Sequence, residues 1–579
     1  MANMIQNAKD SIHALLTAAC ERAAEKGQLP AGAQLSGTVE IPKDSANGDY
    51  AANHAMTGAR ALHMPPRKIA EALVDNLELE GTWFSSVEVA GPGFINFRLA
   101  PSWYADVLRC VTEEGQDYGR VDEGHGRRLM VEFVSANPTG PMHMGNARGG
   151  VLGDALASVM DRAGYQVWRE FYVNDAGNQI EKFASSIDAR YRQLLLGEDA
   201  VGFPADGYQG EDIRELAKAF LDEHGDSFLN ADVETRHAAM ARFGLDRNIP
   251  RMQADLRRYG VEYDEWFFES SLHKSGYVQE TVAKLTERGY TYEKDGALWL
   301  KTAQILTEVL LKAGKKQEDI DRLDLKDDVL KRANGFYTYF AADIAYHRNK
   351  LEERGFDLAI NVWGADHHGH VARLKGALDA LGLDGEHRLQ IVLMQLVKLM
   401  SDGHEVRMSK RTGKAISLTN LLDDIPVDSA RYFFNSRAES PVLFDLELAQ
   451  RQDNENPVYY VQYAHARICT LIENLAAEGH PVPETADAAL LTDETERELI
   501  KQLAALPEEI RLAARDYDPS RVNKYVTELA ARFHRFYTVC RIKDAEPGLL
   551  EARLRLCDCV RRVIAISLSI IGVTAPEKM

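Results

Sequence analysis

Cysteine is scarce in this sequence of 579 residues, and its spacing excludes the common cysteine-based sites. The six cysteines are Cys20, Cys110, Cys469, Cys540, Cys557 and Cys559. No C-x-x-C pair occurs, which excludes the usual zinc and dithiol motifs. We therefore expect reduced thiols packed in the core and no structural metal.

Positive charge is also in short supply. The chain has 68 Lys and Arg against 88 Asp and Glu, which gives a net charge of −20. Non-specific nucleic-acid binding depends on Lys and Arg that neutralise phosphates. The balance argues against such binding by the whole surface, although it does not exclude a local basic face.

Long apolar runs are absent. The segment Met1–Leu16 carries Asp10 and lacks the apolar core of a signal peptide. The longest late run, Val563–Val573, is far shorter than the ~18 residues that span a bilayer. The sequence therefore predicts a cytoplasmic protein that makes no contact with a membrane, and we expect a monomer.

The composition that is present is that of a globular protein of several domains. The chain is 45% hydrophobic and 27% charged, which is ordinary for folded proteins. A domain usually takes ~100–200 residues, so about three to five are expected. Changes in the hydrophobic pattern divide the chain at 1–112, 113–425 and 426–579.

The first unit has the pattern of a small α+β module. Helical periodicity alternates with short strand patterns, and Gly and Pro mark the turns. The predicted elements are a helix at Ile5–Lys26, a strand at Gly37–Ile41, a helix at Ala51–Leu77, and strands at Val87–Val89 and Phe94–Leu99.

The middle unit alternates apolar strands with helices, which is typical of a parallel sheet with crossover helices. The predicted strands are Arg128–Val134, Tyr165–Tyr172, Leu358–Trp363 and Arg388–Leu393, and the predicted helices are Met144–Ala163 and Ala372–Leu383. Residues 185–290 are acidic and helical and predict an insertion, and from Val427 onward the pattern is helical only. The expected fold class is α/β: a Rossmann-like parallel-sheet core split by an insertion, with an N-terminal α+β module and a C-terminal all-helical domain.

One candidate site is the segment Pro141–Asn146, between a predicted strand and a predicted helix. A helix N-terminus presents free N–H groups that attract phosphate, and Gly145 permits close approach. His143 and Asn146 can both donate hydrogen bonds to developing negative charge. Taken alone, the short segment favours a structural capping turn.

A second candidate is the basic segment Arg407–Lys414, which follows the turn Ser401–Gly403. Four of its eight residues are basic. Lys410 would neutralise a departing pyrophosphate, while Ser409 and backbone N–H groups would hold its oxygens. The alternative is a solvated basic loop.

In this order the two segments resemble the HIGH and KMSKS signatures of class I aminoacyl-tRNA synthetases. The positions that match are His143 and Gly145 in the first and Met408, Ser409 and Lys410 in the second. The departures are Met144 for Ile, Asn146 for the last His, and Arg407 and Arg411 for the outer Lys and Ser.

Further segments resemble the arginyl-tRNA synthetase family in particular, and the resemblance covers nearly the whole chain. They are Val131–His143, Phe171–Gln179, Tyr337–Asp343, Trp363–His370 and Asp428–Arg431. The last of these is similar to the DALR motif that opens the family's anticodon-binding helical domain. The N-terminal module resembles the family's additional tRNA-binding domain.

The resemblance implies ATP-dependent ligation of L-arginine to tRNA(Arg) through an arginyl-adenylate, with ATP and its accompanying Mg²⁺ as cofactors. The alternative is a nucleotidyl- or adenylyltransferase of the same core that acts on no tRNA. By resemblance, the catalytic residues are His143, Asn146 and Lys410. The implied ATP-binding residues are His143, Gly145, Asn146, Gly364, Asp366, His370, Met408, Ser409 and Lys410. The implied arginine-binding residues are Glu132, Ser135, Asn137, His143, Tyr339, Asp343 and His367.

An arginine substrate requires acceptors for a guanidinium, preferably carboxylates. Glu132 near the end of the first core strand and Asp343 are candidates, and Tyr339 lies one helical turn before Asp343. Glu132 could instead be a buried structural partner. Tyr339 and Asp343 could be a surface tyrosine and part of a helix salt bridge.

The histidine-rich segment Asp366–His370 could be misread as a metal site. Neighbouring side chains point in different directions, so convergence on one ion is not expected. Strand ends at the switch point of such a sheet normally bind ligand. We prefer Asp366 as an acceptor for ribose hydroxyls, with one histidine on ATP or arginine.

A local basic region is present near the end of the chain. The window Arg511–Arg562 has 12 Lys and Arg against 7 Asp and Glu, a net charge of +5. It also contains the aromatic residues Tyr517, Tyr525, Phe533, Phe536 and Tyr537. Basic and aromatic side chains together suit unstacked RNA bases. The alternative is a helical bundle with aromatics inward and charge outward.

Overall fold

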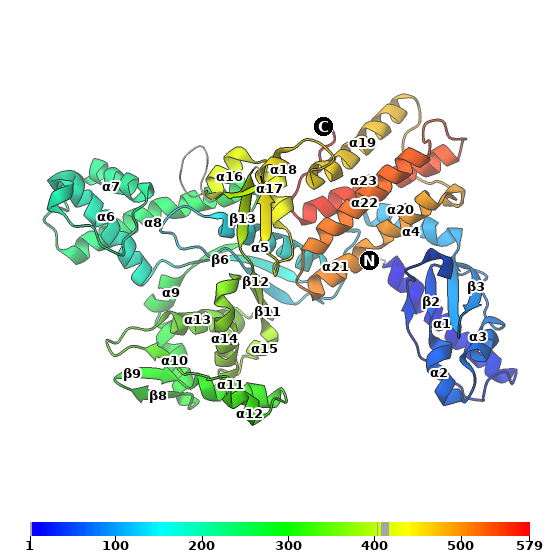
Figure 1. Ribbon diagram of the computed structural model, residues 1–579, viewed down its shortest axis with the longest axis horizontal. Coiled ribbons are helices and arrows are strands. Elements are labelled where there is room, and N and C mark those ends of the chain that lie inside the picture. The colour runs from blue at the N-terminus through cyan, green and yellow to red at the C-terminus, as the bar shows by residue number, and fades with distance from the viewer. Residues whose placement is uncertain (1–2, 402, 407–415) are drawn as a thin grey trace.

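The computed structural model describes residues 3–401, 403–406 and 416–579. Figure 1 shows an elongated molecule in which the α/β core lies between the helical bundle and two lobes, and the N-terminal module projects from the far end of the bundle. No helix in the described ranges is long and apolar enough to cross a membrane. The predicted fold class is confirmed.

The N-terminal module is a four-stranded antiparallel sheet, in the order β1-β2-β4-β3, packed against helices. Its elements are α1 (Met4–Glu25), β1 (Val39–Glu40), β2 (Tyr50–Ala52), α2 (His54–Leu62), α3 (Pro66–Val74), β3 (Phe84–Ala90) and β4 (Phe94–Leu99). The single helix predicted over Ala51–Leu77 is wrong. Its first residues pair in β2, and a left-handed residue at His63 (φ +52°) followed by Pro65 and Pro66 divides the rest into two helices.

The core is a five-stranded sheet, in the order β12-β11-β5-β6-β7, and every pair in it is parallel. Its strands are β5 (Arg128–Glu132), β6 (Gln166–Val173), β7 (Glu265–Phe268), β11 (Leu358–Gly364) and β12 (Leu389–Met394). The crossover helices include α5 (Met144–Arg162) and α14 (His368–Ala380). The predicted strand–helix–strand units are confirmed. The expectation that 185–290 is wholly an insertion is wrong, because β7 inside it is an edge strand of the core sheet.

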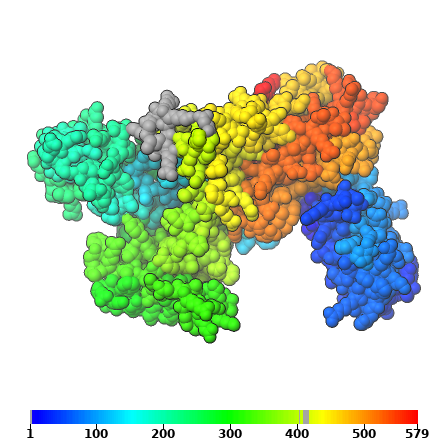
Figure 2. All heavy atoms as spheres, viewed as in Figure 1, coloured from blue at the N-terminus to red at the C-terminus, as the bar shows by residue number. Residues whose placement is uncertain are grey.

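Two lobes project from the core in different directions, one coloured teal and one green in Figure 2. One lobe is built from α6 (Asn178–Leu196), α7 (Glu211–His224) and α8 (Val233–Arg258) around its own apolar cluster. The other carries the three-stranded sheet β10-β9-β8. Its elements are α9 (Glu269–Lys274), α10 (Tyr277–Glu287), β8 (Thr291–Lys294), β9 (Ala297–Leu300), α11 (Thr302–Lys312), α12 (Gln317–Asp321), β10 (Asp328–Lys331) and α13 (Tyr339–Arg348).

The C-terminal region is a helical bundle, but the prediction that the chain is helical only after Val427 is wrong. The strand β15 (Val442–Asp445) pairs in parallel with β13 (Val397–Ser401), which also pairs with β14 (His404–Val406). The remaining helices are α4 (Pro101–Glu114), α15 (Gly385–Arg388), α16 (Leu418–Asp424), α17 (Val427–Phe434), α18 (Leu446–Gln450), α19 (Pro457–Ala477), α20 (Glu494–Ala504), α21 (Leu506–Arg515), α22 (Ser520–Val539) and α23 (Leu549–Ile570).

The burial of its aromatic side chains decides whether the basic window Arg511–Arg562 presents them to RNA or packs them inside the bundle. Tyr525, Phe533 and Phe536 are buried, so they cannot stack on RNA bases. For these three residues the alternative is correct, because their rings point into the helical bundle.

The six cysteines are free as predicted, and all except Cys469 are buried.

A buried arginine, Arg431 of α17, joins the core to the bundle. Its side chain is fully buried and forms an ion pair with Asp154 of α5. Its guanidinium also donates to the carbonyls of Tyr259 and Gly260, both at 3.1 Å, and of Ile571 at 3.2 Å. The planar guanidinium of Arg431 therefore satisfies hydrogen-bond acceptors from three separate segments of the chain.

We expect Arg431→Ala to lower the free energy of unfolding by about 3–5 kcal/mol, the cost of removing one partner of a buried ion pair. Arg431→Lys should recover only part of this, because an ammonium cannot reproduce the fork. Urea unfolding measures both. Arg515→Ala is the control, because it removes an exposed ion pair with Asp516 and should leave the urea midpoint of unfolding unchanged. An equally small effect of Arg431→Ala would contradict the stabilising role of the buried arginine.

Candidate functional site

The loop that follows β5 has an unusual backbone. Val134 and Ser135 lie at φ +69° and +42°, a region that non-glycine residues rarely adopt and that β-branched residues adopt least. Ser135 Oγ donates to Glu132 Oε1 at 2.9 Å and accepts from the Tyr172 amide at 3.2 Å. Strained backbone of this kind concentrates at functional sites, and the exposed Asn137 lies in the same loop.

His143 is the N-cap of α5. Its Nδ1 accepts from the Gly145 amide at 3.1 Å, while Asn146 Oδ1 accepts from the His143 amide at 3.0 Å. The surrounding protein desolvates the ring, which lowers the pKa of His143. The ring is therefore neutral at pH 7 and carries its proton on Nε2, so it can donate one hydrogen bond outward from the cap.

A cavity of about 870 Å³ opens at this helix N-terminus. It brings together the ends of β11 and β12, the start of α5 and the strands β13 and β14. The predicted site residues that line it are His143, Gly145, Asn146, Gly364, Asp366 and His367. Lys398 and Glu405, an ion pair at 3.3 Å, both lie in its wall. A volume of this size with a helix N-terminus at one end suits a nucleotide and its phosphates.

The second predicted phosphate segment, Arg407–Lys414, lies outside the described residues. It contains Met408, Ser409 and Lys410. The chain on either side of them reaches the cavity, since Val406 and Ile416 both line it. Ser417 also forms a backbone bridge with His143. The roles expected for the three residues stay predictions.

Beside this cavity, α13 positions the predicted guanidinium acceptors. Tyr339 is its first residue, and Asp343 lies one turn later, as the spacing predicts. The Tyr339 hydroxyl accepts from the Asn178 amide at 3.1 Å. Asp343 Oδ2 lies 3.0 Å from His370 Nε2. His370, expected to contact ATP, therefore contacts the group expected to bind arginine, while His367 lines the larger cavity.

Glu132 is a buried structural partner, so the expectation that it is open to a guanidinium is corrected. Its Oε2 lies 2.5 Å from Lys350 Nζ, and Lys350 is fully buried. Lys350 also donates to Asn361 Oδ1 at 3.1 Å. Asn361 in turn contacts His347 at 2.8 Å. This network supports the base of the site instead of lining it.

Sequence reasoning missed two residues of the site, Glu269 and Tyr172. Burial, followed by the negative charges of Glu269 and Asp343, holds the pKa of Tyr172 well above its usual range. Glu269 opens α9, which packs against α13, the helix that carries Asp343. Glu269 is buried and follows β7 directly, and this strand was hidden inside the segment predicted to be an insertion. A strand ending in a carboxylate was the signal that could have found it.

Three family models match successive parts of the chain. The model for the arginyl tRNA synthetase N terminal domain matches residues 10–99. The model for the class I (R) tRNA synthetase catalytic domain matches residues 108–454, and the DALR anticodon binding domain matches residues 461–579. The chain belongs to the arginyl-tRNA synthetase family.

Relatives in this family match the chain from end to end. The arginine–tRNA ligase of Caldanaerobacter subterraneus subsp. tengcongensis is 52% identical over 582 residues, which cover 100% of both chains. That of Ruminiclostridium cellulolyticum is 49% identical over 582 residues with the same coverage. A Campylobacter jejuni structure described as an arginyl tRNA synthetase has a TM-score of 0.72 and 32% identity, and it covers 83% of this chain. The Thermus thermophilus synthetase, at 23% identity and TM-score 0.71, shares the fold.

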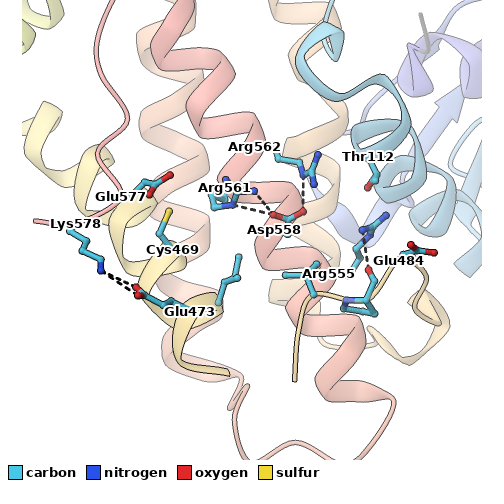
Figure 3. Close-up of a pocket in the computed structure, with 13 residues that line it drawn as sticks. Thr112, Cys469, Glu473, Glu484, Arg555, Asp558, Arg561, Arg562, Glu577 and Lys578 are labelled. Carbon is cyan, nitrogen blue, oxygen red and sulfur yellow. Dashed lines mark hydrogen bonds and ion pairs between the residues drawn. The ribbon is translucent and has the colours of Figure 1, made fainter. Parts of the chain in front are cut away.

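In this family member the helical domain contains a second hollow, of about 720 Å³, between α19 and α23 (Figure 3). Its arginines are largely committed within the protein, because Asp558 accepts from both Arg561 and Arg562. Lys578 near the chain end pairs with Glu473 of α19 at 3.2 Å, so the chain end lies against the helical domain. Around this hollow, the positive residues of the Arg511–Arg562 window therefore do not form an open basic face.

Two substitutions separate the capping role of His143 from its role toward a ligand. We expect His143→Asn to keep the cap, since Asn is a favoured N-cap residue, and to leave thermal stability close to wild type. His143→Ala should lose about 1 kcal/mol of stability. Both should lower kcat for arginylation by ~100-fold or more, the scale of losing one preorganised donor. Full kcat in the His143→Asn enzyme would show that the ring serves only as a cap.

Proposed function

We propose that this protein ligates L-arginine to tRNA(Arg) in two steps, with ATP consumed and AMP and pyrophosphate released. The full-length relatives named arginine–tRNA ligase support the reaction. The observation that carries the proposal is a pair of adjoining sites at the carboxyl ends of the core strands. One contains the buried Glu269 and Asp343, which lies 3.0 Å from His370, and the other is a cavity of about 870 Å³ at the N-terminus of α5.

In the proposed first step, an oxygen of the arginine carboxylate attacks the α-phosphorus of ATP. A bond to that oxygen forms as the bond to pyrophosphate breaks, giving arginyl-adenylate. The neutral His143 ring donates from Nε2 toward the developing charge on the phosphate, and the amide end of Asn146 lies beside it. We assign Lys410 the departing pyrophosphate. Positioning and charge stabilisation account for the rate, because the protein forms no covalent bond.

In the second step, the 2′-hydroxyl of the terminal adenosine attacks the arginyl carbonyl carbon, the proton of that hydroxyl is released, and AMP leaves with its bonding electrons. Mg²⁺ would enter with ATP. Among the described residues no group of three or more His, Cys, Asp or Glu side chains could hold a metal ion. The triphosphate oxygens would therefore supply the ligands, as is usual for Mg²⁺ with nucleotides.

The substrate side chain is expected between Asp343, Glu269 and the hydroxyls of Tyr172 and Tyr339. A guanidinium offers five donors in a plane and no acceptor, so it fits a site built from acceptors. Lysine offers a compact ammonium that cannot bridge two separate carboxylates in one plane. Recognition of the planar guanidinium explains how arginine can be distinguished from lysine without a separate editing site.

The helical domain has one aromatic and basic face that suits RNA. Tyr459 and Tyr463 of α19 stack at 6.2 Å between ring centroids, and Tyr463 also stacks on His534 of α22. The Arg467 guanidinium lies 4.2 Å from the centroid of the Tyr537 ring. Partly exposed rings beside an arginine can accept unstacked bases. We propose this face, with the N-terminal module, as the tRNA-binding surface remote from the reaction.

The alternative, an adenylyltransferase that acts on no tRNA, is disfavoured. The family models for the N-terminal and anticodon-binding domains both match, and such an enzyme would need neither domain. The cytoplasmic location and monomeric state expected from the sequence stay predictions.

Charging assays with total tRNA, ATP and Mg²⁺ test the proposed function. With each of the twenty radiolabelled amino acids in turn, label should enter tRNA only with arginine. Arginine is selected because its guanidinium alone satisfies both carboxylates of the pocket. Label from another amino acid, or from none with a folded enzyme that binds ATP, would contradict the proposal.

Asp343→Asn tests the amino-acid pocket. We expect the KM for arginine to rise by ~10- to 100-fold, because a hydrogen bond between charged groups contributes about 1.5–3 kcal/mol. The KM for ATP should change little. Asp319→Asn is a control, since Asp319 lies in the same lobe and forms an exposed ion pair with Arg322 at 3.3 Å. An unchanged arginine KM in Asp343→Asn would remove Asp343 from the pocket.

A further inference from the structure

A short hairpin leads from the small sheet of the second lobe into α13. The amide of Arg332 donates to the Phe336 carbonyl at 2.9 Å, and the Thr338 amide donates to the Leu330 carbonyl at 2.9 Å. Lys331 and Tyr337 form a backbone bridge between these two bonds. The tip of the hairpin is therefore ordered by its own backbone.

The tip exposes an aromatic side chain. Phe336 is 71% exposed, although a phenylalanine is normally among the more buried residues. A single exposed hydrophobic residue needs no explanation in itself. Phe336 differs from other exposed hydrophobic residues in its charge environment and in its place in the fold.

The hairpin is basic within an acidic protein. Residues 329–342 include Lys331 and Arg332 and contain no Asp or Glu, whereas the whole chain has a net charge of −20. Neither Lys331 nor Arg332 has an ion-pair partner in the described part of the chain. The Lys331 ammonium instead lies 5.4 Å from the centre of the Tyr337 ring. Two unpaired cations in the same short hairpin as an exposed aromatic ring are a combination that suits single-stranded nucleic acid.

The hairpin also stands at the rim of the amino-acid pocket. Phe336 is three residues before Tyr339, whose hydroxyl contacts the first residue of α6 in the opposite lobe. One turn further along the same helix is Asp343. Nucleotides that precede a terminal ribose held near Asp343 would therefore lie close to this rim.

We propose that the Lys331–Tyr337 hairpin binds the single-stranded 3′ end of the tRNA, with a base stacked on Phe336 and phosphates beside Lys331 and Arg332. The assignment rests on the proposed function and names a binding element for it. The exposed outer face of the hairpin is the expected contact. Lys331, Arg332 and Tyr337 also line a hollow of about 570 Å³, together with Glu287 and Glu293, whereas Phe336 does not line it.

A binding cycle tests the contact in the full-length enzyme. Dissociation constants are measured for an intact tRNA(Arg) transcript and for one lacking its three 3′-terminal nucleotides, with wild type and Phe336→Ala. We expect Phe336→Ala to weaken binding of the intact transcript by roughly 5- to 100-fold, the range for loss of one base–aromatic stack. Both proteins should bind the shortened transcript equally. Phe336→Trp should restore binding of the intact form, because it keeps a stacking face.

Leu323→Ala is the matched control, because Leu323 is an exposed hydrophobic residue, 48% accessible, in the loop before β10 of the same lobe. It should not change either constant. If Phe336→Ala weakens both transcripts by the same factor, or neither, the hairpin does not hold the 3′ end. A wild-type protein that does not bind or charge the intact transcript would instead contradict the proposed function, so the two failures are distinguishable.

Discussion

The pairing of buried carboxylates is the constraint on which the site depends. Three of them, Glu132, Glu170 and Glu269, lie on or directly after core strands, and a fourth carboxylate, the half-buried Asp343, lies on α13. Glu132 is paired with Lys350, and Glu170 is held by two hydrogen bonds from Arg354, at 2.6 and 3.0 Å. Glu269 and Asp343, in contrast, are paired with histidines, at 3.3 and 3.0 Å, and with no Lys or Arg among the described residues. Buried charge is stable only when it is compensated. The pocket therefore retains an unmet requirement for a permanent cation with several donors, which is what a guanidinium provides.

The same logic explains how the separate parts act together. The network from Glu132 through Lys350 and Asn361 ends on His347, whose Nδ1 lies 2.8 Å from the Asp343 carbonyl. It thus links β5, which leads into the strained loop, to α13, which carries the amino-acid pocket. Arg431 connects the back of α5 to the helical domain in a comparable way. Rigid ionic contacts of this kind hold the two adjoining sites in fixed relation, as a reaction governed by positioning requires.

Much of the fold and part of the site could be predicted from sequence because the signals were local. Apolar strands followed by amphipathic helices predicted β5, α5, β6 and β11, and the spacing of Tyr339 and Asp343 placed both on one helix face. The capping geometry of His143 follows from three adjacent residues. The failures involved non-local pairing. The four-residue strand β7 has too short a pattern to identify, and it becomes a core strand only by pairing with β6. Glu269 was missed with it. Likewise, Glu132 could not be assigned without knowing that Lys350, 218 residues away, reaches it.

Calorimetric titration of the enzyme, in the presence of a tRNA(Arg) transcript, with arginine, citrulline and lysine tests the central claim most directly. Citrulline has the shape of arginine but no charge, and lysine has the charge but not the planar fork. If two incompletely compensated carboxylates select the ligand, arginine should bind at least ~100-fold more tightly than either, since each lost charged hydrogen bond costs about 1.5–3 kcal/mol. Citrulline binding as tightly as arginine would contradict the account, because the pocket would then recognise shape and not the charge it is built to receive.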